Sequence, residues 1–323
     1  MPQQLFVFIQ LEFPWALGPA DGRYLVRRED DGEPERVVVL GMLQAERQPL
    51  GAPAGAGWSG RPRRPLLARL RGHARSMPTG PEPAPVPTTR VTVIDPIALA
   101  AENQARAWLA ELDRDREVGA AATIVNRVIH SHRIASADPY VHEVSPEQAL
   151  VIRAGWGEGE QVADGRWLHA RALASPGGWS SSRSAGSRRG SRRDRSWALR
   201  PQERLAALLG ARGAALLCEE IALRARQDLD HERTAHAALE LDRAYALAVR
   251  ELEGEGRQDL AIRIAELEQL HPGVKAQAQT ALLGAIAPGA PGGSAGEKLD
   301  ADVLAHALGR LEAALRARTA AGV

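Results

Sequence analysis

The sequence contains little cysteine, lysine or aromatic side chain. Its 323 residues include a single cysteine, Cys218, which excludes an internal disulfide and any zinc site built from several cysteines. Two of the 41 basic residues are lysine and the rest are arginine. This arginine content, with abundant alanine and glycine, matches the amino-acid usage of a GC-rich genome. Arginine density alone is therefore poor evidence for a nucleic-acid partner.

Long apolar runs are also missing. No stretch approaches the roughly 20 apolar residues that span a bilayer. The apolar run from Leu5 to Phe13 contains Gln10 and Glu12 and lacks a basic leader, so we expect a strand and not a signal peptide. We therefore expect a cytoplasmic protein without a membrane partner.

The net charge of +1 hides an uneven distribution. Two low-complexity inserts, 45–88 and 174–198, each carry a net charge of +5, while the remaining segments are acidic. The first insert is dense in proline, and the second consists almost entirely of Ser, Gly and Arg. Neither can bury enough apolar surface to fold, so we predict a disordered insert and a flexible linker.

Residues 1–173, apart from the first insert, predict an α+β domain. Apolar residues alternate over 5–13, which is typical of a strand, and turn residues then separate two further strands. These three are expected to form a meander. Asp95-Pro96 predicts a helix start. The expected order is strands at 5–13, 24–27, 36–43 and 90–94, helices at 95–112 and 117–134, and strands at 149–153 and 165–172.

Residues 199–323 predict an all-α domain. Apolar residues recur there at three- and four-residue spacing, and the connections are short, which favours an antiparallel helical bundle. The expected helices are 201–209, 214–228, 235–252, 259–270, 274–286 and 301–318. Cys218 lies among Leu216, Leu217 and Ile221 and is expected in the core of this domain.

One hairpin in this half carries a limited resemblance. Within 221–249 a turn around Asp230 precedes Ala235 and Leu239. This hairpin resembles one unit of the tetratricopeptide family, and the resemblance implies that Ala235 and Leu239 stand where that family uses small and large packing residues. A repeat architecture needs several units, and no second copy follows at the expected period, so a plain bundle remains the prediction.

The best candidate in this sequence for an acid–base or metal site is a group of histidines and carboxylates in the N-terminal half. His130 and His132 close the predicted second helix, and His142 and Glu143 follow in the next loop. Imidazole and carboxylate groups are common catalytic groups and metal ligands. However, residues two apart diverge on a helix, and a histidine at a helix C-terminus is favoured electrostatically without any function. We predict no metal site and no cofactor.

The segment 155–167 is the candidate ligand groove of the α+β domain. It combines a Gly-rich turn with Trp156 and Trp167, both expected to be exposed. The glycine spacing is not that of a dinucleotide loop, because Glu158 and Glu160 would repel a pyrophosphate.

The second insert is the candidate nucleic-acid-binding segment. Guanidinium groups can pair with phosphates, and tryptophans at its margins can stack on bases. The residues in question are Arg183, Arg188, Arg189, Arg192, Arg193 and Arg195. The alternative is a tether whose arginines follow genome composition.

Three functional hypotheses follow. The first is a non-enzymatic cytoplasmic interaction or scaffold protein, whose helical domain presents a groove to a protein partner or to a second copy. The second is a nucleic-acid-associated protein that acts through the arginine-rich inserts. The third is an enzyme or metal-binding protein that uses His130, His132, His142 and Glu143. No complete catalytic motif in the sequence decides among them.

Overall fold

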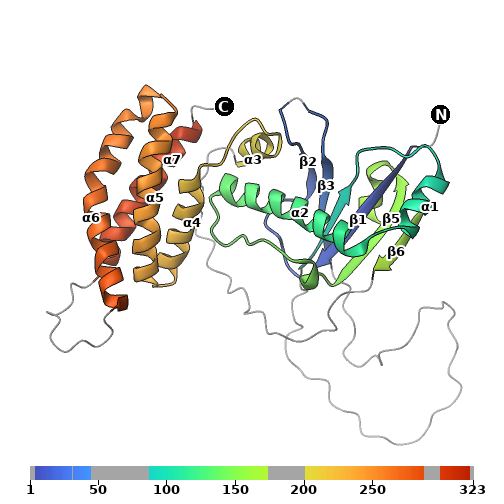
Figure 1. Ribbon diagram of the computed structural model, residues 1–323, viewed down its shortest axis with the longest axis horizontal. Coiled ribbons are helices and arrows are strands. Elements are labelled where there is room, and N and C mark those ends of the chain that lie inside the picture. The colour runs from blue at the N-terminus through green and yellow to red at the C-terminus, as the bar shows by residue number, and fades with distance from the viewer. Residues whose placement is uncertain (1–3, 31, 45–86, 174–200, 287–298, 321–323) are drawn as a thin grey trace, which may run out of the picture.

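The protein consists of a sheet region followed by a helical region (Figure 1). The structure is a computed structural model that describes residues 4–30, 32–44, 87–173, 201–286 and 299–320. An antiparallel sheet with helices precedes a set of helices, which confirms the predicted fold class. Both inserts lie outside the described residues, except Pro87 and Thr88, which belong to a strand.

The sheet has six antiparallel strands in the order β2-β3-β4-β1-β5-β6. The strands are β1 (Leu5–Phe13), β2 (Gly22–Val26), β3 (Arg36–Gln44), β4 (Pro87–Ile94), β5 (Val151–Glu158) and β6 (His169–Leu173). The predicted meander of the first three strands is wrong, because β1 pairs with β4 and β5 and not with β2. β1 has a hydrogen-bonded neighbour on each side, so it lies inside the sheet, whereas the first strand of a meander would lie at an edge.

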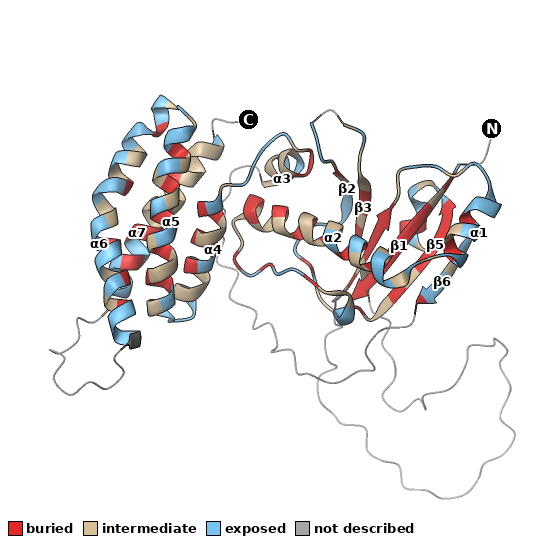
Figure 2. Cartoon of the chain, viewed as in Figure 1, coloured by how far each residue is buried: buried red, intermediate tan, exposed pale blue. Residues whose placement is uncertain are grey.

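Helices cover one face of this sheet. They are α1 (Glu102–Ala110), α2 (Arg114–Ser136) and α3 (Pro201–Leu209), and the 3₁₀ helix η1 (Pro146–Gln148) follows α2. Buried residues run along β1 and along one side of α2 (Figure 2). Because side chains alternate along a strand, Val7, Ile9 and Leu11 face these helices while Phe8 faces the other side.

The helix predicted from Asp95 begins later than expected. The Asp95 side chain accepts a hydrogen bond from the Ile97 N–H at 3.0 Å, but α1 starts only at Glu102. Between them, Leu99 forms a backbone bridge with Leu5, with N···O distances of 2.7 and 3.1 Å. This pairing requires extended backbone at Leu99, so the helix cannot begin before it.

Helix α3 lies in the predicted helical domain but packs on the sheet region. Its Leu205 and Leu209 are buried in the core that the sheet shares with α2. The Arg27 N–H at the end of β2 donates to the Leu209 carbonyl at 2.9 Å. Helix α3 therefore lies between the sheet and the remaining helices (Figure 1).

The helical region is a closed bundle. It comprises α4 (Leu217–Asp230), α5 (Thr234–Gly254), α6 (Ala261–Ile286) and α7 (Ala301–Ala320), with the 3₁₀ helix η3 (Gln258–Leu260) before α6. Helix α7 contacts α4, α5 and α6, so the last helix closes the set instead of extending a row of hairpins. The bundle prediction is confirmed, and the tetratricopeptide-like hairpin α4–α5 is one part of it.

Two sequence predictions within the bundle have different outcomes. Cys218 is fully buried in the core, as predicted, and burial raises the pKa of its thiol. The predicted break near Pro272 is wrong, because α6 continues through this residue. Leu267 and Val274, two turns apart, are both buried in the same core, which holds the helix together across the proline.

The Gly-rich segment is a strand and not a turn. β5 continues through Gly155 and Gly157, and the chain turns back only in the 3₁₀ helix η2 (Gly159–Asp164). A Cβ at Gly155 would lie 2.2 Å from the His169 carbonyl oxygen, and one at Gly157 would lie 2.6 Å from Val162 Cγ1. Both positions are glycine because the chain that follows β5 folds closely over them.

Among the helices that the structure describes, none combines the length and apolar character needed to cross a membrane. The cytoplasmic location stays a prediction.

Gly155→Ala is expected to lower the free energy of unfolding by about 3 kcal/mol or more, because its methyl group would overlap the backbone of β6. The control is Gly119→Ala in α2, where a Cβ meets no atom within 4 Å and where alanine should stabilise the helix by up to about 1 kcal/mol. Urea unfolding of both variants measures the difference. Equal effects of the two substitutions would contradict the packing described for β5 and β6.

Candidate binding cleft

The histidine candidates do not assemble into a site. His130 and His132 lie on α2, whereas His142 and Glu143 are exposed in the loop that follows. His132 packs near Gly18 and Val141, since a Cβ at Gly18 would lie 3.1 Å from His132 Cδ2. In the described ranges, no three His, Cys, Asp or Glu side chains are placed to hold a metal ion together.

The two candidate groove tryptophans lie on opposite faces of the sheet. Trp156 is only 2% exposed and belongs to the core beneath the helices, where its ring stacks on His169 at 4.7 Å. Trp167 packs against Phe8 on the other face, with ring centroids 5.9 Å apart. The prediction that both side chains are exposed is therefore wrong, because Trp156 is buried and Trp167 is half-buried. The structure does not bring the two rings into one groove.

The arginines proposed to bind nucleic acid, from Arg183 to Arg195, lie outside the described residues. Their role stays a prediction.

A cleft of about 560 Å³ lies where α3 meets the bundle. One wall consists of α3, with Glu203, Arg204 and Leu208, and of the turn that follows α3. The opposite wall comes from the bundle and carries Glu255 and Arg318. Because α3 packs on the core of the sheet, both regions of the protein contribute to this cleft.

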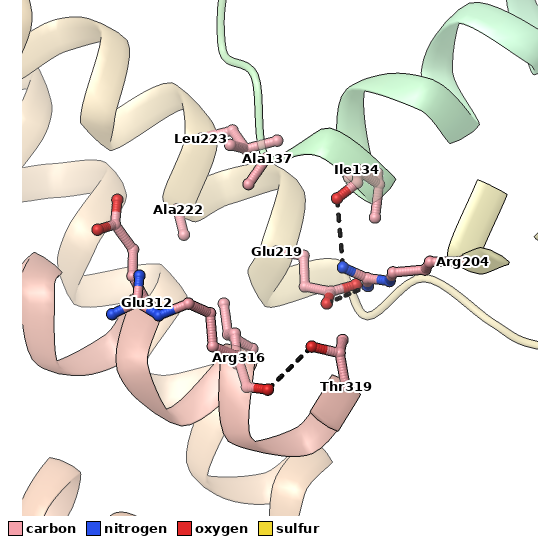
Figure 3. A pocket seen from close by; sticks show the side chains of 10 residues that line it. Ile134, Ala137, Arg204, Glu219, Ala222, Leu223, Glu312, Arg316 and Thr319 are labelled. Carbon is pink, nitrogen blue, oxygen red and sulfur yellow. Dashed lines mark hydrogen bonds and ion pairs between the residues drawn. The ribbon is translucent and has the colours of Figure 1, made fainter. Parts of the chain in front are cut away.

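Arg204, which lines this cleft, connects the two regions. Its guanidinium donates to the Ile134 carbonyl at the end of α2, at 3.2 Å, and pairs with Glu219 on α4 (Figure 3). Glu219 is only 5% exposed, so its charge needs partners inside the protein. It also accepts a hydrogen bond from the Leu216 N–H at 2.9 Å, which completes a cap at the start of α4.

Arg318 and Arg257 form the bundle side of the same network. Arg318 Nε lies 2.5 Å from Glu255 Oε1, and its Nη1 lies 3.8 Å from Glu219 Oε1. Arg257 donates to the Arg318 carbonyl at 2.7 Å and pairs with Asp259 through two hydrogen bonds. The pKa of Arg257 is raised, chiefly by its hydrogen bond to Asp259. These contacts fix both guanidinium groups at the cleft.

The turn after α3 places Arg212 at the edge of the cleft. Ala211 adopts a left-handed conformation with φ of 59°. The Arg212 N–H donates to the Ala207 carbonyl at 2.9 Å, and the Ala211 N–H donates to the Leu208 carbonyl at 3.4 Å. This is the Schellman arrangement, here with alanine at the position that glycine usually occupies. The Arg212 side chain is exposed, and within the described part of the chain it has no ion pair or hydrogen bond.

A second, much smaller cavity of about 50 Å³ lies between the two regions. Ile134 and Ala137 line it from the sheet region, and Leu223 and Leu315 line it from the bundle (Figure 3). The Tyr140 hydroxyl donates to Asp230 Oδ2 at 2.7 Å and joins the two regions at a further point. The lining of the cavity is mixed, because it also includes the charged residues Arg204, Glu219, Glu312 and Arg316.

Sequence reasoning missed the residues of this cleft. Arg204, Arg212, Arg257 and Arg318 are a few among many arginines, and no local motif distinguishes them. Glu219 does carry a signal, because it shares a helix face with Ala222 and Leu223 at three- and four-residue spacing. A charge on an apolar stripe indicates a buried partner of opposite charge.

Arg204→Met is expected to lower the free energy of unfolding by about 3 kcal/mol, because it leaves the buried Glu219 carboxylate with less compensation. Arg106→Met is the control, since Arg106 pairs with Glu102 at 2.8 Å on an exposed helix surface and should change stability by less than about 0.5 kcal/mol. Urea unfolding measures both. A silent Arg204→Met would show that the junction does not depend on this pair.

Burial lowers the pKa of His132 from its ordinary value of 6.5, and the Asp138 charge opposes this only in part. The unfolded chain therefore binds the proton at a higher pH than the folded protein does. The stability associated with neutral His132 is fully present above pH 6.5 and decreases as the pH falls from 6.5 toward the lowered pKa. His132→Gln should weaken the loss of stability on acidification, measured by urea unfolding across this range. The matched control is His142→Gln, because His142 is exposed in the loop after α2.

All described residues that line the cleft follow the second insert, and the Ile134 carbonyl that Arg204 contacts precedes it. Neither a protein-family model, nor a curated protein, nor a solved structure matches this chain. The functional proposal therefore rests on the contacts, charges and burial of the cleft residues.

Proposed function

We propose that the protein is a non-enzymatic interaction protein of the cytoplasm, and that it presents the cleft between α3 and the bundle to a partner protein. The observation that carries this proposal is the construction of the cleft. Its volume of about 560 Å³ falls within the range of ligand sites. Its walls come from two regions with separate hydrophobic cores.

The lining chemistry supports binding more than catalysis. The described residues that line the cleft include no His, Cys, Lys or Tyr, and the groups there that could transfer a proton or attack a substrate are the Glu203 and Glu255 carboxylates and the Thr319 hydroxyl. Glu255 is paired with Arg318, and the Thr319 hydroxyl donates to the Arg316 carbonyl. Arginine keeps its proton at all physiological pH values and so acts by recognition. Arg204, Arg257 and Arg318 are held by carbonyl groups as well as carboxylates, which orders them before any partner arrives.

The interaction hypothesis predicts a partner whose capture depends on the cleft. The tagged full-length protein is used to recover partners from its native cell extract, with and without nuclease. A stoichiometric protein should persist after nuclease treatment and should be lost with Arg212→Glu. Arg243→Glu is the matched control, because Arg243 is 71% exposed on α5 and does not line the cleft.

Other outcomes would favour the other two hypotheses. If the recovered material disappears with nuclease, or with deletion of 175–196, the arginine-rich insert carries the function. If the purified protein retains a metal that His132→Ala removes, the enzyme hypothesis gains support. Either result would contradict the proposed interaction through the cleft.

A further inference from the structure

We propose that a second copy of this chain packs antiparallel on the outer face of α6, so that the protein forms a symmetric dimer through this helix. The surface is separate from the cleft, because no residue of α6 is among the described residues that line the cleft. The inference therefore goes beyond the proposed function and does not depend on it.

Helix α6 lies on the side of the bundle that points away from the sheet (Figure 1). Among the described elements, α5, α7 and η3 pack against it, and its Leu267, Val274 and Ala281 are buried in the core that these elements share. The opposite side of α6 is exposed (Figure 2). This outer face is the surface that the proposal concerns.

The outer face of α6 carries an uncharged seam with a seven-residue period. The seam consists of exposed residues that follow one another at spacings of three and four: Ile262, Ala265, Gln269, Pro272, Ala276, Gln279 and Leu283. Its two ends are large apolar side chains, since Ile262 is 81% exposed and Leu283 is 69% exposed. This spacing is the pattern by which two helices pack along a common line. The exposed sides of α4 and α5, in contrast, carry Arg224, Arg243 and Arg250.

Two charges beside the seam favour an antiparallel second copy. Glu268 and Lys275 are exposed and stand two helical turns apart, so both lie on the same flank of the seam. Within the described ranges neither side chain has an ion pair of its own. A two-fold axis that passes near Pro272, perpendicular to both helices, places identical flanks side by side. Glu268 of each copy then lies opposite Lys275 of the other, which gives two reciprocal ion pairs.

A parallel pair of helices would leave these charges unused. In that arrangement each of the two flank positions faces the opposite flank of the other helix, where Gly273 and Thr280 stand. Neither of these residues is charged, so the pattern of Glu268 and Lys275 is specific for the antiparallel orientation.

The seam is also complementary to its own reverse. Ile262 and Leu283 stand at nearly equal distances along the chain from Pro272, so an antiparallel copy brings Ile262 of one chain near Leu283 of the other. The residues between them are smaller or uncharged, which allows the two helices to approach. A surface that matches itself after a two-fold rotation fits a second copy of the same chain.

The test measures the dimer Kd of the full-length protein by sedimentation velocity from about 5 to about 500 µM, a range that covers micromolar affinities. The wild type should show a monomer–dimer equilibrium. Glu268→Lys and Lys275→Glu should each raise the Kd at least about tenfold, because both ion pairs become repulsions. The double variant E268K/K275E exchanges the charges and should return the Kd to within about threefold of the wild type.

The two single variants change the net charge in opposite directions, so an effect of overall charge cannot weaken the dimer in both. An apolar substitution tests the end of the seam. Ile262→Glu should raise the Kd at least about tenfold. Its matched control is Ile97→Glu, because Ile97 is 72% exposed in the segment before α1, and this variant should leave the Kd within about twofold.

Three results would overturn the inference. The first is a wild-type protein that stays monomeric over the whole range of concentration. The second is a dimer that Ile262→Glu and Glu268→Lys do not weaken, which would assign the contact to another surface. The third is a double variant as weak as the single ones, which would show that the two charges do not meet across the dimer. Circular dichroism and thermal unfolding of each variant confirm that the fold is retained in these comparisons.

Discussion

The junction between the two regions depends on one buried carboxylate. Glu219 pairs with Arg204 of α3, lies near Arg318 of α7 and caps its own helix at Leu216. A buried charge is tolerated only when its partners are in place, so this residue requires that α3, α4 and α7 meet at one point. The two hydrophobic cores remain separate. The ion pair and the Tyr140–Asp230 hydrogen bond thus determine how the sheet region and the bundle lie relative to each other.

The cleft is a consequence of this arrangement. Helix α3 belongs to the core of the sheet through Leu205 and Leu209, yet its polar side reaches the bundle. Since only a few side chains connect the regions, the space beside Arg204 is not filled by either core. Arginines from both sides then line that space, and a change that separates the regions would also take the cleft apart.

Helix ends decide where several of these residues lie. Helices α2, α3 and α4 each end in a Schellman arrangement, with Ala137, Ala211 and Glu232 in the left-handed conformation at φ of 49°, 59° and 60°. None of these positions is glycine, so the local sequence does not mark which residue takes the left-handed conformation. The surrounding structure holds this conformation, which is unfavourable for residues with a Cβ. The turn after α3 brings Arg212 to the rim of the cleft, and the turn after α2 brings Ala137 to the junction.

The sequence by itself determined the fold class and the elements with a clear hydrophobic period. Alternation over Leu5–Phe13 and three- and four-residue spacing in the C-terminal half are local patterns, and they set which segments become strands or helices. The tertiary structure alone decided the strand order, the opposite faces of Trp156 and Trp167, and the meeting of Arg204 with Glu219. These features depend on contacts between residues far apart in the chain. A periodic pattern shows that a residue is buried, but it does not specify which distant residue it packs against.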